Sequence, residues 1–200
     1  MRMWRSLAPL VMATLVVACG SDGRSGEPGS GAEVPAGGGP HDPLPAIVRL
    51  VEEITSGDVD AVLGAVRYQR MPCASRPGGI GGPPPCPPGV AEGTELELLP
   101  VGTCEAELWD EETLASSLNR LGPLALVGVY RWPGGAYDAG PLTLTLDHVA
   151  LFAYQGPAGD RLAFAVLLED GMVVGLKFGC GETPEALAER QGLGDSLVDP

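Results

Sequence analysis

The chain opens with an apolar run that is too short to cross a membrane. This uncharged run, residues 7–17, follows Arg2 and Arg5 and ends at the small residue Ala18. A transmembrane helix needs roughly 20 apolar residues, whereas the apolar part of a secretory signal needs about 7 to 15. The pattern therefore predicts a signal peptide over residues 1–18 that is removed on export.

Cys19 directly follows this segment. Val16-Val17-Ala18-Cys19 resembles the bacterial lipobox, in which a branched apolar residue, a small residue and a cysteine are recognised for diacylation and cleavage. The resemblance implies that acyl chains on Cys19, such as palmitate, anchor the mature chain to the extracytoplasmic side of a bacterial membrane. The alternative is an ordinary signal peptide followed by an incidental cysteine.

The next segment, residues 20–45, has no apolar periodicity. Of its 26 residues, 16 are Gly, Pro or Ser, which is typical of a flexible linker. We therefore expect lipidated Cys19 and a tether over 19–45, one folded domain over 46–182, and a short helix and tail over 183–200.

Helical periodicity and capping residues predict four helices. In the first, apolar residues recur at i, i+3, i+4 and i+7. The expected starts are Asp42, Asp58, Asp110 and Thr183, and the expected ends are Gly57, Leu63, Gly122 and Gly192. The last eight residues are expected to fray.

A period of two predicts the strands. An extended segment over 66–71 and a strand over 94–101 precede the third helix, and four strands follow it, over 124–132, 142–155, 161–169 and 172–180. The last three are joined by hairpin-type connections at 156–160 and 170–171, so they should form an antiparallel meander.

The resulting order, ααββαββββ, predicts an α+β roll with the helices on one side of a curved antiparallel sheet. This order, with the Ser-Gly-Asp-Val-Asp-Ala-Val-Leu run over 56–63, resembles the cone-shaped superfamily of nuclear transport factor two, ketosteroid isomerase and SnoaL-type polyketide cyclases. A cystatin-like fold is the nearest competitor. The Gly/Pro run over 79–84, flanked by cysteines, also resembles a pattern in uncharacterised secreted bacterial proteins.

The chain is acidic, with 12 basic and 26 acidic residues and a formal charge of −14. Loss of Arg2 and Arg5 with the signal makes this −16. Such a charge excludes nucleic acid as a partner and leaves the acyl chains to hold the membrane unaided.

Four cysteines remain once Cys19 is lipidated, an even number that predicts two disulfides in an oxidising compartment. Of the three possible connectivities we favour Cys73 with Cys86 and Cys104 with Cys180, because the first pair brackets a loop rich in proline and glycine. A zinc site is not expected, since no two cysteines have the usual ligand spacing.

A cone of this type encloses a pocket, and His148 is the main candidate for a catalytic group in it. Its expected strand face is otherwise almost wholly apolar, and a structural histidine is the alternative. Asp147 has the opposite parity, so the two side chains should not meet without a bulge. Tyr68, Tyr130 and Tyr154 could line the same pocket or simply pack.

No residue matches a catalytic signature of the resembled families, and no cofactor motif is found. An acidic cluster could bind calcium, but it lacks EF-hand spacing, and acids are favoured at a helix start. The cluster consists of Glu105, Glu107, Asp110, Glu111 and Glu112.

The loop over 73–86 could recognise a partner or only connect two strands. The sequence as a whole favours a lipid-anchored binding or interaction module for an unknown protein or a small apolar ligand. The alternative is a small isomerase, dehydratase or hydrolase that uses His148.

Overall fold

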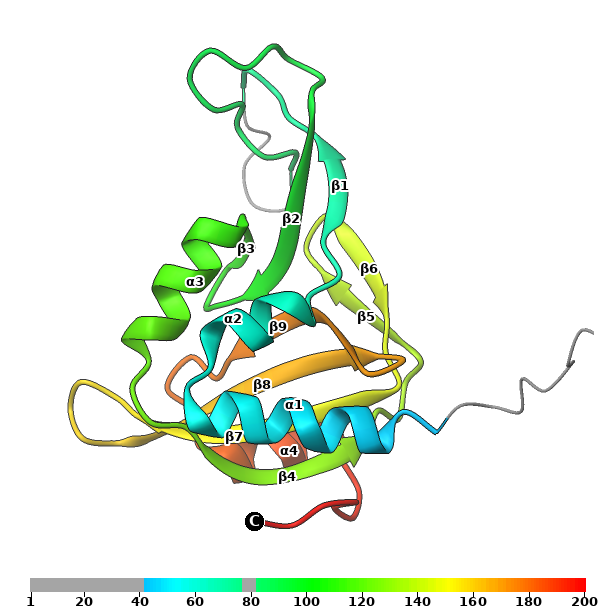
Figure 1. Ribbon diagram of the computed structural model, residues 1–200, viewed down its shortest axis with the longest axis vertical. Coiled ribbons are helices and arrows are strands. Elements are labelled where there is room, and N and C mark those ends of the chain that lie inside the picture. Colours follow the sequence, from blue (N-terminus) through cyan, green and yellow to red (C-terminus); the bar gives the residue numbers. More distant parts are fainter. Residues whose placement is uncertain (1–41, 77–81) are drawn as a thin grey trace, which may run out of the picture. The chain divides into compact units, whose positions relative to one another are not determined.

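The structure of the protein is a computed structural model that describes residues 42–76 and 82–200. The predicted signal peptide, Cys19 and most of the tether lie outside the described residues, as does the tip of the 73–86 loop. Among the described residues, the chain forms an α+β domain (Figure 1).

Four helices and nine strands make up this domain. The helices are α1 (Leu44–Ser56), α2 (Val59–Gly64), α3 (Glu111–Arg120) and α4 (Pro184–Gln191). The strands are β1 (Gln69–Pro72), β2 (Glu95–Gly102), β3 (Ala106–Trp109), β4 (Ala125–Arg131), β5 (Ala136–Ala139), β6 (Leu142–Thr145), β7 (His148–Gln155), β8 (Arg161–Glu169) and β9 (Met172–Phe178).

The helices form where the periodicity predicts them. The first helix buries Ile47, Leu50, Val51 and Ile54 on one face, and Gly57 ends it with a left-handed φ of 78°. Side chains of Asp58, Asp110 and Thr183 accept the predicted N-cap hydrogen bonds of the other three helices. The N-cap of α1 is Pro43 and not the expected Asp42, and it makes no side-chain cap hydrogen bond, so the capping prediction holds for the other three helices.

The main sheet has the strand order β1-β2-β9-β8-β7-β4, with β3 paired to β2. The predicted meander is confirmed, because β7, β8 and β9 pair antiparallel in sequence. The expectation of a wholly antiparallel sheet is wrong, since β2 and β9 run parallel and pair Gly102 with Lys177. Alternation within a strand reports which face is buried and carries no information on the direction of its neighbour.

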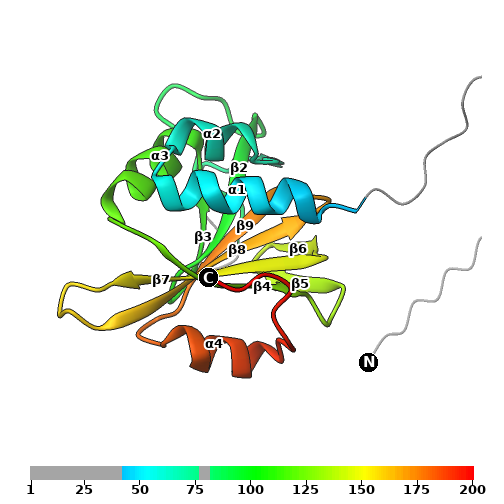
Figure 2. The ribbon, with the colours of Figure 1, turned by 60° about the horizontal axis from the view of Figure 1, so that its bottom comes forward.

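Helices cover both faces of this sheet (Figure 2). One core lies between the sheet and α1, α2 and α3, and includes Ile47, Leu114, Phe152 and Phe164. A second core lies on the opposite face, where Leu187 of α4 packs with residues of the small β5–β6 sheet. The three helices of the predicted roll share one face of the sheet, whereas α4, which the predicted order ααββαββββ did not include, covers the opposite face.

This two-sided burial explains the composition of the central strands. Residues 163–168 of β8 are all buried, and residues 148–153 of β7 are buried as well. Strands covered on both faces read as continuous apolar runs. The C-terminal helix is thus part of the folded domain, and so is most of the tail.

The C-terminal tail, residues 193–200, packs against β4. Val198 forms an antiparallel bridge with Val129 of β4, and the Ser196 side chain packs over Gly128, where an added Cβ would lie 2.5 Å from the Ser196 Oγ. Residues 196–198 are therefore held against β4, and the prediction that the tail frays is wrong for them.

The predicted strand over 142–155 is broken into two. β6 ends at Thr145 and belongs to the small sheet with β5, whereas β7 starts at His148 in the main sheet. Leu144 and Leu146 consequently belong to the second core, while Ala150 and Phe152 belong to the first. The short strands β3 and β5 were not predicted.

Candidate functional site

His148 lies in the main sheet between β4 and β8, where it pairs with Arg131 and Leu168. The residue is only 6 % exposed and is the one buried polar residue among those that the structure describes. Its Nδ1 lies 2.9 Å from Oδ1 of Asp147. The imidazole is therefore partnered, and its partner is the residue that strand parity excludes.

Asp147 can reach His148 because it occupies the break between β6 and β7. Its second carboxylate oxygen accepts the backbone N–H of Asp170 at 2.8 Å. Asp170 and Gly171 both have left-handed φ angles, 52° and 76°, in the tight turn between β8 and β9. The Asp147 carboxylate thus links the His148 side chain to this turn. These contacts give His148 a structural role.

The space between the helices and the sheet is filled with side chains. The cavity there measures about 10 Å³, which is barely enough for one water molecule, and apolar residues such as Leu99, Leu114 and Phe164 line it. His148 does not line this cavity or any of the other three described below. The expected interior pocket is therefore closed.

The three candidate tyrosines do not share one pocket. Tyr68 and Tyr154 pack against the first core, and Tyr130 packs against the second, on the opposite face of the sheet. Burial is the main cause that raises the pKa of each phenol, helped for Tyr68 by the nearby Glu111. All three phenols are therefore protonated at neutral pH.

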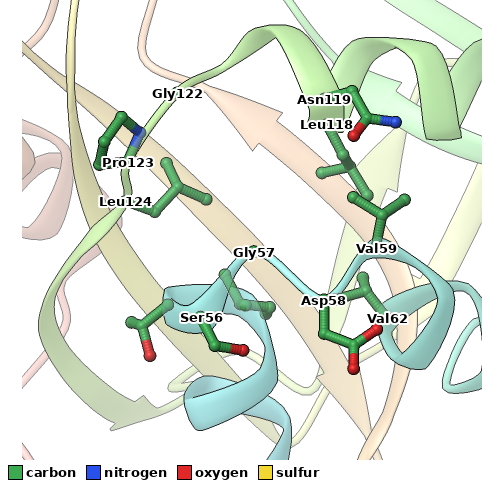
Figure 3. A pocket seen from close by; sticks show the side chains of 12 residues that line it. Ser56, Gly57, Asp58, Val59, Val62, Leu118, Asn119, Gly122, Pro123 and Leu124 are labelled. Atoms are coloured by element: carbon green, nitrogen blue, oxygen red, sulfur yellow. The ribbon is translucent and has the colours of Figure 1, made fainter.

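A surface pocket of about 320 Å³ lies where the ends of three helices meet (Figure 3). We call it the helix-end pocket. Ile54 and Val62 contribute apolar surface, and Gly57, Asp58, Leu118, Asn119 and Leu124 are among the other residues that form its walls.

The polar groups of the helix-end pocket are already engaged. Asp58 Oδ1 accepts the Ala61 N–H, the Asn119 amide donates to the Ala115 carbonyl, and the hydroxyls of Thr55 and Ser56 donate to carbonyls within α1. These contacts complete helix ends. Few polar groups are left to orient a ligand in this pocket.

A third small cavity, of about 10 Å³, lies on the face covered by α4 and is lined by Trp132, Tyr137 and Leu187 among others. It is too small for anything larger than a water molecule.

A larger pocket, of about 490 Å³, opens at the end of the sheet beside α3, and we call it the aromatic pocket. Trp109 at the end of β3, Tyr154 of β7 and Phe178 at the end of β9 contribute half-buried rings. The ring centroids of Trp109 and Phe178 are 5.9 Å apart, and those of Tyr154 and Phe178 are 6.3 Å apart. The other lining residues are Thr103, Cys104, Ser117, Arg120, Leu121, Cys180 and Gly181.

Arg120 provides a cation on the wall of this pocket. The guanidinium donates to the Ser117 hydroxyl at 3.2 Å, and it makes no ion pair with any residue in the described ranges. The Trp109 indole N–H is used, because it donates to a Glu107 carboxylate oxygen at 2.7 Å. The aromatic pocket therefore combines apolar rings with one available cation.

The cysteines behave differently from one another. The predicted Cys73–Cys86 disulfide is confirmed, with a Cα–Cα distance of 4.9 Å. The predicted Cys104–Cys180 disulfide is not formed, and both residues are exposed free thiols. The two are nevertheless neighbours, and hydrogen bonding with the Cys104 thiol, followed by burial, raises the pKa of Cys180.

The acidic cluster also has structural contacts. One Glu107 oxygen accepts from the Thr103 hydroxyl, Asp110 caps α3, and Glu111 and Glu112 occupy the first turn of that helix. Within residues 42–76 and 82–200, no three His, Cys, Asp or Glu residues are grouped as a metal site would require.

Only part of this site could be expected from the sequence. Tyr154 was a candidate for an interior pocket, whereas Trp109, Arg120 and Phe178 were not singled out. They come from three separate elements and share no motif, so no local signal connects them.

In comparisons with known proteins, no family model, curated protein or solved structure matches this chain. In the part of the chain that the structure describes, no helix is both long and apolar enough to span a bilayer.

Proposed function

We propose that this chain is a lipid-anchored extracytoplasmic binding module whose ligand enters the aromatic pocket. The single observation that supports this is the gathering of three half-buried aromatic rings around one opening with Arg120, which has no ion pair among the described residues. Tyr, Trp and Arg are the residues that most often dominate binding energy. The volume of about 490 Å³ also falls within the range of about 300–1,000 Å³ found for ligand pockets.

The lining indicates the chemistry of the ligand. Trp109, Tyr154 and Phe178 offer ring faces and edges to an apolar body, and Arg120 offers a guanidinium to an acidic group. The chain as a whole carries more acidic than basic residues, 26 against 12. We therefore propose a small apolar molecule that carries one anionic group, with no cofactor.

The proposed architecture is the cone-like roll of the superfamily that includes nuclear transport factor two. It is supported by the order of the first helices and strands and by the position of α1, α2 and α3 on one face of the curved sheet. The filled interior favours a pocket at the end of the sheet over one inside the cone.

Binding is tested with a fluorescent naphthalene sulfonate, which is apolar and anionic, and the full-length chain carrying Cys19→Ser. Arg120→Gln should weaken binding by about tenfold, because a hydrogen bond to a charged group contributes about 1.5–3 kcal/mol. Arg131→Gln is the matched control, since Arg131 is exposed on β4 and makes no ion pair within the described ranges. An uncharged naphthalene should not distinguish the two variants.

Trp109→Leu should weaken both probes, while Trp132→Leu on the opposite core should leave them unchanged in a variant that still melts cooperatively. Equal affinities of the Trp109 and Arg120 variants and the unmodified chain would rule out this pocket as the binding site. The ligand of the proposed binding module would then be a protein and not a small molecule.

The anchor is tested separately by cell fractionation. Cys19→Ala should release the protein from membranes or leave it unprocessed, because the acyl chains attach to that sulfur and the folded domain is too acidic to bind anionic lipid. A variant that is cleaved at the same bond and stays on the membrane would contradict the lipobox interpretation.

The alternative function, a small isomerase, dehydratase or hydrolase, is less well supported. Its candidate catalytic group, His148, is buried, is bonded to Asp147 and lines none of the four cavities. A measured activity that His148→Gln abolishes without changing the melting temperature would support the enzyme over the binding module.

A further inference from the structure

Two thiols lie together on the rim of the aromatic pocket. Cys104 belongs to the turn between β2 and β3, and Cys180 follows the end of β9 by two residues. β2 and β9 are adjacent parallel strands, paired at Gly102 and Lys177, so their continuations leave the sheet at the same end. Residues 76 positions apart in sequence are thereby brought side by side.

Both thiols are accessible, and both line the aromatic pocket. Each is exposed, and a hydrogen bond between the sulfurs is the largest cause of the raised pKa of Cys180. Gly179 and Gly181 flank Cys180. Gly181 has a left-handed φ of 82°, a backbone conformation that glycine adopts more readily than other residues.

We propose that Cys104 and Cys180 are a reversible dithiol that closes to an internal disulfide by exchange with an external disulfide. This differs from Cys73–Cys86, which is already bonded and has a partly buried sulfur pair within a hydrogen-bonded loop. Exposed pairs are the more easily reduced class, whereas shielded structural bonds resist reduction.

The chemistry balances with a small disulfide, RSSR, as the oxidant. The Cys104 thiolate attacks one sulfur of RSSR, which forms a mixed disulfide at Cys104 and releases the first thiol, RSH, after protonation. The Cys180 sulfur, once deprotonated, attacks the Cys104 sulfur and displaces the second RSH. Two protein thiols are oxidised to one disulfide, and RSSR is reduced to two thiols.

Closing this bond would fix the rim of the pocket. It joins the β2–β3 turn, which leads directly to Trp109, to the segment that follows Phe178. The environment of Trp109 should therefore change between the two redox states. Control of ligand binding by this step rests on the proposed function, whereas the thiol chemistry does not.

The test uses the full-length chain with Cys19→Ser, equilibrated in mixtures of reduced and oxidised glutathione and then quenched with a maleimide. Intact mass should show no labelled thiol at the oxidising end, without a bound glutathione, and two labelled thiols in the more reducing mixtures that still leave Cys73–Cys86 closed. The Cys104–Cys180 bond should open at a ratio of reduced to oxidised glutathione about tenfold or more below the ratio that opens Cys73–Cys86.

Single variants provide the matched controls. Cys104→Ser and Cys180→Ser should each stop at a mixed disulfide with glutathione, because the resolving thiol is missing. Tryptophan fluorescence should change between the oxidised and reduced ends, and Trp109→Phe should remove that change.

Three outcomes would overturn the proposal. Stable glutathione adducts on both cysteines of the parent chain would mean that the two sulfurs cannot meet. A constant count of two thiols across all mixtures would mean that they do not exchange, and a peptide linking either residue to Cys73 or Cys86 would assign different partners. None of these results depends on a ligand, so failure here is distinguishable from failure of the binding proposal.

Discussion

The Asp147 carboxylate offers the sharpest test of how the central sheet is held. It contacts the buried His148 at 2.9 Å and accepts the Asp170 N–H at 2.8 Å. Asp147→Ala removes both contacts without placing a larger group at the break between β6 and β7. It should therefore destabilise the domain through loss of hydrogen bonding.

The size of the effect follows from the burial of each partner. The His148 side chain is 8 % exposed, and leaving a buried polar group unpaired costs about 1–3 kcal/mol. Asp170 is exposed, so the loss of its bond costs about 0.5–1.5 kcal/mol. The sum, about 3 kcal/mol, corresponds to a lower melting temperature by about 6–12 °C for a domain of this size.

Urea unfolding measures the free energy of unfolding directly. With a slope of about 2 kcal/mol per molar, the midpoint of Asp147→Ala should fall by about 1.5 M. Asp138→Ala is the matched control, because the exposed Asp138 side chain in the β5–β6 hairpin accepts one hydrogen bond, from Thr143, among the residues that the structure describes. That variant should change the midpoint by less than about 0.5 M, because surface substitutions usually change stability by at most about 0.5 kcal/mol.

A second substitution tests whether the unpaired His148 imidazole, and not a general loss of structure, destabilises Asp147→Ala. If the unpaired imidazole is the main penalty, Asp147→Ala combined with His148→Leu should be more stable than Asp147→Ala alone, since an apolar side chain needs no partner there. A double variant that is less stable than either single variant, or an Asp147→Ala midpoint equal to that of Asp138→Ala, would refute the reasoning.

Three further predictions concern the loop, the tail and the pH dependence. Replacing Cys73 and Cys86 by serine should lower the free energy of unfolding by about 3 kcal/mol on the chain-entropy estimate for 13 residues of separation, and an unchanged urea midpoint would count against this. Deleting residues 196–200 should expose the edge of β4 and promote self-association, seen as dimers in sedimentation velocity; a purely monomeric variant would show that the tail does not protect this edge. A hydrogen bond from Arg161 lowers the pKa of Glu185, so the pair stabilises the domain above the ordinary glutamate pKa of 4.5 and this contribution is lost as pH falls through the lowered pKa; Arg161→Gln should therefore lower the melting temperature more at pH 7 than at pH 3, and an equal decrease at both would contradict this.

The sequence by itself determined the local elements of this protein. The spacing of Ile47, Leu50, Val51 and Ile54 defines the buried face of α1, and the caps at Asp58, Asp110 and Thr183 define where the other helices begin. The hairpin that joins β8 to β9 follows from its tight turn. These features depend on residues within one or two turns of each other, so periodicity and capping are enough to reveal them.

The tertiary structure decided everything that depends on which elements become neighbours. It placed β9 parallel to β2, it covered both faces of the sheet, and it broke the apolar run over 142–155 so that Asp147 meets His148. The run reads as one strand because a chain that passes from one sheet to another keeps its alternation, while the break depends on contacts with β8 and the turn at Asp170.

The aromatic pocket has the same origin. Trp109, Arg120, Tyr154 and Phe178 lie on four elements, and each is an ordinary residue in its own segment. Only the pairing of strands that are distant in sequence brings the four side chains and the two thiols to one end of the sheet. A single sequence carries no record of that pairing, because hydrophobic burial is satisfied by any arrangement that covers the same apolar faces.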